Sequence, residues 1–363
     1  MKSKTLLILL AALAIGVIAY YFNENSNQRS VDANSNLIPE LAENLNRITK
    51  FTVVDAGNVT LSEVSKSDKG WIVNNRDGYK ANIAAVRDLF TGLAEAMLVE
   101  AKTSDADNYA KLGVEDVADK QAQGVLLSIE GLQKDANIIF GKDGNSGKNT
   151  QYVRRNDKPQ SWLINKRLNI KRDVTDWLQK DILDIPPERI KTVHIKHPDG
   201  SEVNIANNGE EEYEYTLDAI TPEGMNLSES EIYQVANALS SLQLRDVVAE
   251  SKIDTKSIEP IVTTFKTFDG LTISSKAYVT ELDAHFTLEV GYSSDEIDQS
   301  VVNDESQDES TSDAAIKSDP RAAEELAAKS TDKLDGWAYI FPTITQNAMT
   351  KKLEDFFIAK ENQ

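Results

Sequence analysis

A long apolar run opens the chain and gives way to a polar tract. Residues 5–22 (TLLILLAALAIGVIAYYF) carry no charged side chain, and about 17 to 25 apolar residues cross the hydrocarbon layer of a membrane as a helix. Two lysines precede the run and three aromatic residues close it. This order of basic and aromatic residues is typical of a helix whose N-terminus is cytoplasmic. We therefore expect residues 1–22 to be a cytoplasmic tip and a single-pass signal-anchor helix in the inner membrane, with the C-terminal bulk in the periplasm.

A cleaved signal peptide is the alternative interpretation of this run. Its small-x-small site is Ala12-Leu13-Ala14. Cleavage there would leave a short apolar region before the cut and strand the apolar residues 15–22 at the new N-terminus. We therefore expect an uncleaved anchor, although whether the segment is ever cleaved stays open.

Residues 23–46 connect the anchor to the folded part of the chain. Residues 23–36 (NENSNQRSVDANSN) have no apolar period, which is typical of a flexible tether. Leucines at positions 37, 41 and 45 recur every four residues, and this spacing predicts a short lead-in helix.

From residue 47 the pattern predicts short strands and amphipathic helices in an order that occurs twice. Residues 47–63 (RITKFTVVDAGNVTLSE) and 189–207 (RIKTVHIKHPDGSEVNIAN) each have the strand, glycine-containing turn and strand of a β-hairpin. Helices with one apolar face are predicted over residues 82–97 and 228–242.

The N-terminal ends of these two helices carry capping signals. Asn82 is an N-cap candidate for the first helix. Ser228, with Glu231 three residues later, predicts a capping box for the second.

The same order continues to the C-terminus in both copies. We expect strands ending at Asp105 and Asp254, strands over 124–130 and 261–268, aromatic strands at Trp162 and Trp337, and final helices over 173–183 and 347–357. Leu93 and Leu239 are expected at equivalent core positions. The predicted fold class is α+β: an N-terminal transmembrane helix followed by two tandem, duplicated modules, residues 47–188 and 189–363, in which β-hairpins and antiparallel sheet are packed by amphipathic helices.

The second copy contains an acidic insertion at about residues 294–329. Its counterpart in the first copy is expected to be the short turn GKDGNSGKNT, because the offset between the copies grows by about 30 residues in this region. The segment is acidic, rich in serine and nearly free of aromatic residues, so we expect a solvated loop, with helix near residues 320–329. A specific role for this loop stays open.

Composition excludes several kinds of partner and chemistry. The net charge of −20 opposes binding to nucleic acid and to anionic lipid headgroups. The chain has no cysteine, and therefore no lipobox thiol, disulfide or thiol nucleophile. Length and an apolar fraction of 40% are consistent with two globular modules that have real cores.

The candidate residues for chemistry are few. His194 and His197 lie three apart on a predicted strand, so alternation sends them to opposite faces, and we expect surface histidines beside a turn. His285 stands alone in an alternating strand. We therefore expect no histidine metal site.

Three further segments are candidates for ligand binding. Gly141 to Lys148 is glycine-rich but lacks the spacing of a phosphate-binding loop, so it is expected to be a turn. Arg154 and Arg155 have the chemistry to grip an anion, but a solvent-facing pair beside a turn is the expectation. The acidic positions of the insertion lack the central glycine of a calcium loop; they are Asp304, Glu305, Asp308 and Glu309. We expect no catalytic, cofactor-binding or metal residues.

The motif order resembles a known bacterial family. RITKFTVVDAGNVTLSE, GWIVN, VRDLFTGLAEA, NYAKLGVED, FGKDG, YVRR and DWLQKDIL follow one another as in a domain-of-unknown-function family of membrane-anchored envelope proteins. Genes of this family lie beside genes for gliding-motility-type ABC transporters. The resemblance runs from about residue 47 to the C-terminus. It implies partnership with an ABC transporter permease and its gliding-type auxiliary subunit, and it implies no catalytic residues or cofactor.

Two functions follow as hypotheses. The first is a non-enzymatic extracytoplasmic accessory or scaffold subunit, associated with a gliding-type ABC transporter complex. The alternative is a periplasmic carboxylate-dependent hydrolase or glycan-binding protein. An enzyme is expected to show a pocket with converging carboxylates of shifted pKa, whereas a scaffold is expected to expose apolar patches or strand edges. The transported cargo and the oligomeric state do not follow from the sequence.

Overall fold

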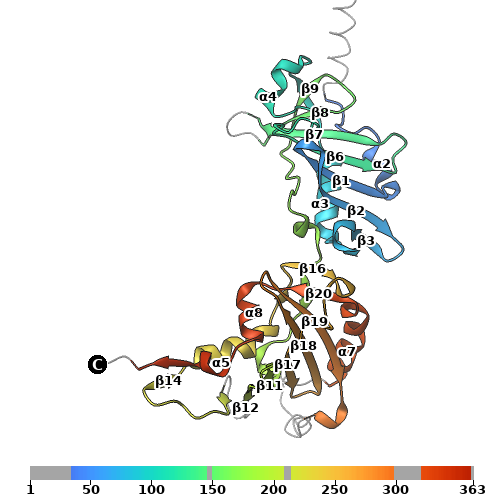
Figure 1. Ribbon diagram of the computed structural model, residues 1–363. Coiled ribbons are helices and arrows are strands. Elements are labelled where there is room, and N and C mark those ends of the chain that lie inside the picture. Colours follow the sequence, from blue (N-terminus) through green and yellow to red (C-terminus); the bar gives the residue numbers. More distant parts are fainter. Residues whose placement is uncertain (1–33, 145–148, 208–213, 298–319, 361–363) are drawn as a thin grey trace, which may run out of the picture. The chain divides into compact units, whose positions relative to one another are not determined.

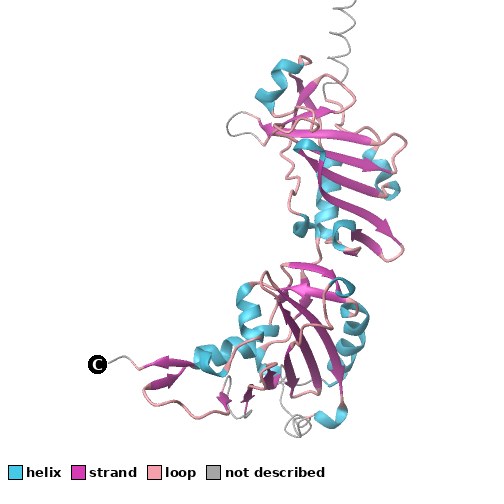
Figure 2. Ribbon diagram, in the orientation of Figure 1, coloured by secondary structure: helices cyan, strands magenta, loops and turns pink. Residues whose placement is uncertain are grey.

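The computed structural model divides into two compact units, with the division between Gln179 and Lys180 (Figure 1). It describes residues 34–144, 149–207, 214–297 and 320–360. The predicted anchor over residues 1–22 and most of the predicted tether lie outside these residues. Among the described residues, no helix has the length and apolar character needed to cross a membrane. In each unit more of the described residues lie in strands than in helices (Figure 2).

The first unit contains a nine-stranded antiparallel sheet in the order β4-β3-β2-β1-β6-β7-β8-β9-β5. The strands are β1 (Lys50–Asp55), β2 (Val59–Ser67), β3 (Gly70–Val73), β4 (Tyr79–Lys80), β5 (Leu98–Ala101), β6 (Val125–Glu130), β7 (Ala136–Asp143), β8 (Gln151–Arg155) and β9 (Ser161–Ile164). The predicted hairpin is confirmed as β1 and β2, joined by a turn in which Gly57 has a φ of 71°. Glycine suits that turn because it adopts positive φ without strain.

Short helices cover the sheet of the first unit. They are α2 (Leu41–Asn44), α3 (Ile83–Ala94), α4 (Tyr109–Leu112) and the 3₁₀ helix η5 (Val174–Trp177). Helix α3 packs on β1 through an edge contact between Phe90 and Phe51, whose ring centroids are 5.6 Å apart. Trp177 completes this cluster at 4.9 Å from Phe51. Leu93, at the end of α3, is fully buried.

The second unit contains an eight-stranded antiparallel sheet in the order β13-β12-β11-β17-β18-β19-β20-β16. The strands are β11 (Ile190–Lys196), β12 (Glu202–Asn207), β13 (Tyr215–Leu217), β16 (Asp246–Ala249), β17 (Ile261–Thr267), β18 (Leu271–Val279), β19 (Ala284–Tyr292) and β20 (Trp337–Ile340). Two small ribbons accompany it: β10 (Asp181–Leu183) pairs with β15 (Leu242–Gln243), and β14 (Met225–Leu227) pairs with β21 (Phe357–Ala359). The β10 pairing explains why the division precedes the predicted boundary at residue 188.

Helices lie on both sides of this second sheet (Figure 1). They are α5 (Glu229–Ala236), the 3₁₀ helix η7 (Asn237–Leu239), α7 (Pro320–Leu334), α8 (Thr343–Met349) and the 3₁₀ helix η11 (Leu353–Phe356). Leu239 is fully buried, as Leu93 is in the first unit. Asn82 directly precedes α3, and Ser228 directly precedes α5. Leu93 follows Asn82 by the same number of residues as Leu239 follows Ser228.

The two sheets share one order of strands. Reading from β3 in the first unit and from β13 in the second, each strand has a counterpart at the same place and with the same antiparallel pairing. The ladders place Phe51 beside Val64 and Ile129, and Val193 beside Ile205 and Phe265. Phe51 and Val193 are both buried strand positions.

The ladders also correct the predicted aromatic match. Following the ladders from β1 and from β11 shows that Val153 and Phe286 occupy corresponding positions. Val153 pairs with Trp162, and Phe286 pairs with Tyr339. Both Trp162 and Tyr339 are buried. Tyr339, and not Trp337, therefore corresponds to Trp162 in the ladder.

The predicted final helices are wrong in both units. In the first unit a single 3₁₀ turn ends at Trp177, and the chain then bonds to the segment before α3: Gln179 N–H donates to the Lys80 carbonyl at 3.0 Å. In the second unit residues 347–349 end α8, a 3₁₀ turn over Leu353–Phe356 follows, and Phe357 then pairs with Leu227. Sheet-like pairing after each aromatic residue replaces the helical hydrogen bonds that the sequence pattern suggested.

The acidic insertion is placed and folded differently from the prediction. It lies between β19 and β20, whereas GKDGNSGKNT begins inside β7 and ends just before β8, so the two segments are not counterparts. The helix expected near its end is longer, residues Pro320–Leu334, and it buries Ala323, Ala327 and Leu334. Residues 298–319 lie outside the described part of the chain.

Candidate functional site

A groove with a cavity volume of about 380 Å³ lies in the first unit. Its walls are the lead-in segment before α2, the turn between β6 and β7, and the end of β8. The apolar lining is Leu37, Ile38, Pro39, Leu132 and Ile138, and the charged lining is Glu40, Lys134, Asp135, Arg155, Asp157 and Lys158. Pockets of about 300 to 1,000 Å³ with an apolar lining and a few polar groups are typical of small-molecule sites.

Arg155 fixes one wall of this groove. Its Nε and Nη2 atoms donate to the Leu37 carbonyl oxygen at 3.1 and 2.8 Å, and Nη2 also reaches the Asn36 carbonyl at 3.2 Å. The guanidinium thus binds main-chain carbonyl groups of the lead-in segment. The expectation of a solvent-facing arginine is wrong here, because Arg155 is half-buried.

Arg154 lies on the other face of β8, as alternation requires for neighbouring strand residues. It is only 6% exposed, and its Nε donates to the Val114 carbonyl at 2.9 Å. Its guanidinium carbon lies 4.7 Å from the centre of the Tyr109 ring, a cation–π contact. The predicted solvent-facing position is therefore wrong for Arg154 as well, and both arginines bind main-chain carbonyls.

An ion pair crosses the rim of the groove. Lys134 Nζ lies 2.7 Å from Asp157 Oδ2. The hydrogen bond from Lys134 holds the pKa of the Asp157 carboxyl below its usual value. A general acid needs a carboxyl whose pKa is raised toward the working pH. Asp157 is therefore suited to holding the rim, and unsuited to donating a proton near neutral pH.

The histidines differ in their surroundings. His194 is partly exposed, and its Nε2 lies 3.3 Å from Glu202 on the neighbouring strand. His197 is only 4% exposed, and its Nε2 lies 3.2 Å from the Lys351 carbonyl. The prediction of a surface position is wrong for His197, because the segment after α8 covers it. His285 is half-buried and pairs with Tyr278 across the β18–β19 ladder.

The glycine-rich segment begins inside a strand. Gly141 and Lys142 belong to β7, and a Cβ atom on Gly141 would lie 2.4 Å from the Leu112 carbonyl oxygen. The glycine thus permits α4 to pack closely on the sheet. Lys142 Nζ donates to the Ala110 carbonyl at 2.9 Å. The prediction of a turn fails for these two residues, and residues 145–148 lie outside the described part.

No group of three or more metal-ligating side chains is found among the described residues. The acidic positions of the candidate calcium loop lie outside those residues; they are Asp304, Glu305, Asp308 and Glu309.

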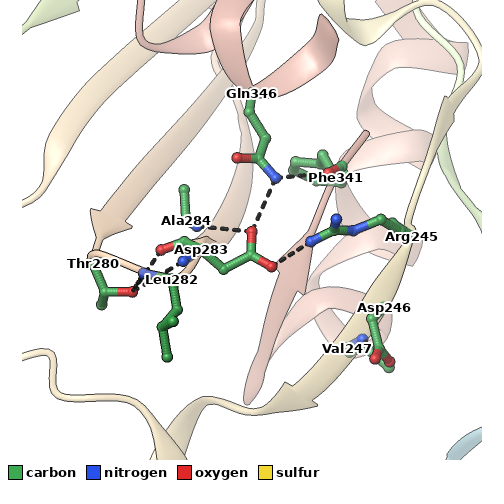
Figure 3. A network of polar contacts seen from close by, with 9 residues as sticks. All are labelled: Arg245, Asp246, Val247, Thr280, Leu282, Asp283, Ala284, Phe341 and Gln346. Atoms are coloured by element: carbon green, nitrogen blue, oxygen red, sulfur yellow. Dashed lines mark hydrogen bonds and ion pairs between the residues drawn. The ribbon is translucent and has the colours of Figure 1, made fainter. Parts of the chain in front are cut away.

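A dense polar network lies at the turn between β18 and β19 (Figure 3). Asp283 is its centre: one carboxylate oxygen accepts from Ala284 N–H at 3.0 Å and from Gln346 Nε2 at 3.2 Å. The other oxygen accepts from Arg245. Gln346 also donates to the Phe341 carbonyl at 2.8 Å. The carboxylate thereby ties the turn to α8 and to the segment before β16.

Thr280 fixes the same turn from inside. Its hydroxyl donates to the Asp283 carbonyl at 2.8 Å and accepts from Asp283 N–H at 3.2 Å. Leu282, at the tip, is 97% exposed. The network therefore positions a turn and holds an apolar side chain in solvent, and its carboxylate is already engaged by three donors.

Two ion pairs of the second unit, each with one buried partner, were not predicted from the sequence. Asp269 is fully buried, and Arg189 Nη2 lies 2.5 Å from its Oδ2 atom, while Thr267 also bonds to it. The signal for this pair was the Asp269-Gly270 turn, in which Gly270 has a φ of 90°. The second pair joins Glu231 to Lys351. The predicted capping box is thus absent at Ser228, because the Glu231 carboxylate forms its ion pair with Lys351 instead.

Comparison with known proteins gives one match. The family model of DUF4340, described as a domain of unknown function, matches residues 71–260, just over half of the chain. The matched segment begins in β3 and ends shortly before β17, so it crosses the division between the two units. No curated protein and no solved structure matches the chain.

Proposed function

The chain belongs to the DUF4340 family, and from that premise we propose that it is a non-enzymatic extracytoplasmic accessory or scaffold subunit. Its proposed partners are the permease and the gliding-type auxiliary subunit of an ABC transporter. The protein binds these partners through exposed surfaces of its two units and carries no catalytic centre.

One observation carries this proposal: the strand order is repeated, but the charged groups are not. Ile138 pairs with Arg155 in the first sheet, and Ser275 pairs with Leu288 at the corresponding place in the second. The neighbouring position is Arg154 in the first unit and Thr287 in the second. A catalytic constellation present in an ancestral module would recur at matching ladder positions. The two arginines of the first unit instead bind that unit's own main chain.

The two units are proposed to be copies of one duplicated module. Support comes from the common strand order and from the matching positions of Leu93 and Leu239. The start of the apolar helix is also tied to the end of the unit by the same hydrogen bond in both units. The residue before the apolar helix donates its N–H to the carbonyl oxygen of the aromatic residue that ends a 3₁₀ helix. Within-chain duplication explains all three features at once.

The protein is proposed to work on the periplasmic face of the inner membrane. Support comes from the uncharged run of residues 5–22, which follows two lysines and ends in aromatic residues. A single anchor and a polar tether hold the two units near the outer portion of a membrane-embedded partner. The effective concentration of the units near that partner is raised by the tether.

Affinity capture of the full-length, detergent-extracted protein tests this function. The permease and the auxiliary subunit are expected to co-purify at constant ratio, and to be absent when residues 1–33 anchor an unrelated globular protein. Capture of neither transporter subunit from cells that express both would overturn the proposal.

One observation favours a second candidate, a glycan-binding protein. The groove of the first unit combines an apolar floor with three carboxylates, Glu40, Asp135 and Asp157. Carboxylates accept hydrogen bonds from sugar hydroxyls. Titration with soluble glycan fragments, followed by NMR shifts of groove residues, distinguishes this candidate, because a scaffold without a glycan site shows no saturable shift.

A further inference from the structure

The second unit carries a small ribbon that stands apart from its main sheet. Strands β14 and β21 pair antiparallel, with Met225 opposite Ala359, Asn226 opposite Ile358 and Leu227 opposite Phe357. Neither strand pairs with the eight-stranded sheet. Figure 1 shows the ribbon extending from the second unit beyond α5.

Apolar side chains of this ribbon lie in solvent on both of its faces. Met225 and Leu227 share one face and are each 37% exposed, while Ile358 is 53% exposed. Paired residues of an antiparallel ribbon point to the same side, so Ile358 lies on the face opposite to Met225 and Leu227. A lone two-stranded ribbon is at best marginally stable in water. Such exposure indicates a surface that a partner covers.

The first unit shows how the corresponding segment looks when it is covered. Counting back from the residues that precede the apolar helices, Asn82 and Ser228, Tyr79 corresponds to Met225 and Ala81 to Leu227. Tyr79 and Ala81 are both only 3% exposed. Tyr79 belongs to β4, which pairs with β3 in the main sheet, and Ala81 forms an antiparallel bridge to Leu178, whereas β14 pairs with β21 alone. The second unit thus exposes the positions that the first unit buries.

The charge around the ribbon limits what can cover it. Residues 223–229 and 354–360 flank and include the two strands, and they contain four carboxylates and one lysine. The carboxylates are Glu223, Glu229, Glu354 and Asp355, and none of them forms an ion pair in the described part of the chain. The ribbon is therefore an apolar centre with an acidic rim.

From this geometry we propose that the β14–β21 ribbon is the docking surface for a protein partner whose contact region is apolar and rimmed by lysine or arginine. Complementary charge at the rim favours such a partner. A second copy of the chain does not fit, because a two-fold contact would set these carboxylates against themselves. An anionic lipid surface is repelled by the same charge. The inference rests on the proposed function, which makes that partner a transporter subunit.

Site-specific photo-cross-linking in cells tests the docking surface on the full-length, membrane-anchored chain. A photoreactive amino acid replaces Asn226, and the adduct is identified by mass spectrometry. The expected adduct joins the chain to the permease or to the auxiliary subunit. Met225→Glu and Leu227→Glu are expected to reduce its yield about ten-fold or more, as for central interface residues.

Control variants separate docking from folding and from charge in general. Leu282→Glu alters a side chain that is 97% exposed elsewhere in the same unit, and is expected to leave the adduct unchanged. Glu229→Gln is expected to weaken the adduct and to reduce its sensitivity to salt. The adduct yields are compared only among variants that keep the thermal unfolding temperature of the wild-type chain.

The outcomes also separate this inference from the proposed function. An adduct with lipid, with a second copy or with a protein outside the transporter overturns the inference, as does the absence of any adduct. If the transporter subunits co-purify with the wild-type chain and with both ribbon variants, the assignment of the ribbon as the docking surface is wrong and the proposed function stands. If they never co-purify with the wild-type chain, the proposed function fails, and the partner assignment fails with it.

Discussion

The main-chain N–H of Asn82 donates to the carbonyl oxygen of Trp177 at 2.7 Å. This bond joins the start of α3 to the end of the first unit, between residues far apart in sequence. The second unit has the same closure, in which Ser228 N–H donates to the Phe356 carbonyl at 2.9 Å. Trp177 and Phe356 each end a 3₁₀ helix and are almost completely buried.

Truncating either aromatic residue is expected to loosen its own unit. Trp177→Ala and Phe356→Ala each remove a large buried side chain, which costs about 3 to 5 kcal/mol. Because two units unfold in one chain, hydrogen exchange measured separately for peptides of each unit is the appropriate readout. Trp177→Phe is the conservative control. A loss of protection in the other unit would contradict the independence of the two cores.

The two helix starts are expected to respond differently to alanine. Asn82 Oδ1 accepts from Ala85 N–H at 3.1 Å, which is an N-cap bond, whereas the Ser228 side chain makes no cap bond. Asn82→Ala is therefore expected to destabilise α3 by about 1 kcal/mol. Ser228→Ala is expected to change the stability of α5 much less, and urea denaturation of both variants checks this. Equal losses would show that the serine caps its helix in solution.

Local patterns of the sequence were enough to predict the hairpins and the apolar helices. Alternation over 47–63 predicted β1 and β2, and the apolar face after Asn82 predicted α3 with its cap. These elements depend on neighbours within a few residues. The α+β class with mostly antiparallel sheet follows from them.

The errors lie where distant parts of the chain decide the local structure. Residues after Trp177 have a helical pattern, but their main-chain groups bond to the strand before α3. Arg154 and His197 look like surface residues in sequence, yet α4 and the segment after α8 cover them. The buried pair of Arg189 and Asp269 joins residues 80 positions apart. No local pattern carries that information.

The pKa of Asp157 offers a test of the groove rim by titration. Because Lys134 lowers the pKa of this carboxyl from its usual 3.8, the interaction stabilises the folded state at pH values above the unfolded pKa. It is lost as the pH falls through the lower folded value. NMR titration is expected to show Asp157 protonating with a pKa below 3.8, and Lys134→Ala is expected to raise that pKa. Both groups are largely exposed, so global stability is expected to change little. An unchanged Asp157 titration in Lys134→Ala would contradict the ion pair.

The predicted anchor is tested by extraction. The native protein is expected to stay in the membrane fraction during an alkaline carbonate wash. Ala12→Arg is expected to cost about 2.5 to 3.5 kcal/mol of insertion free energy and to impair export. Ser26→Arg, in the polar tract, is the control. Release of the native protein by carbonate would favour the cleaved signal peptide.

Helix α7 changes the prediction for the acidic insertion, because the helix belongs to the fold. Replacing residues 298–319 by a short Gly-Ser linker is expected to keep or slightly raise the thermal stability of the second unit, since it removes like charges. Replacing residues 294–329 also removes most of α7 with its buried Ala323 and Ala327. That larger replacement uncovers β18 and β19, which α7 contacts, and it is expected to lower the thermal stability clearly.

A matched pair of substitutions separates helix packing from insertion length. Ala327 is buried and Ala328 is exposed on the same helix. Ala327→Asp places an uncompensated charge against the sheet and is expected to cost about 3 kcal/mol or more, whereas Ala328→Asp is expected to cost little. Calorimetry and hydrogen exchange of β19 measure both. If Ala327→Asp left the protection of β19 unchanged, α7 would not pack on the sheet in solution. The whole of residues 294–329 would then behave as the solvated loop that the sequence pattern suggested.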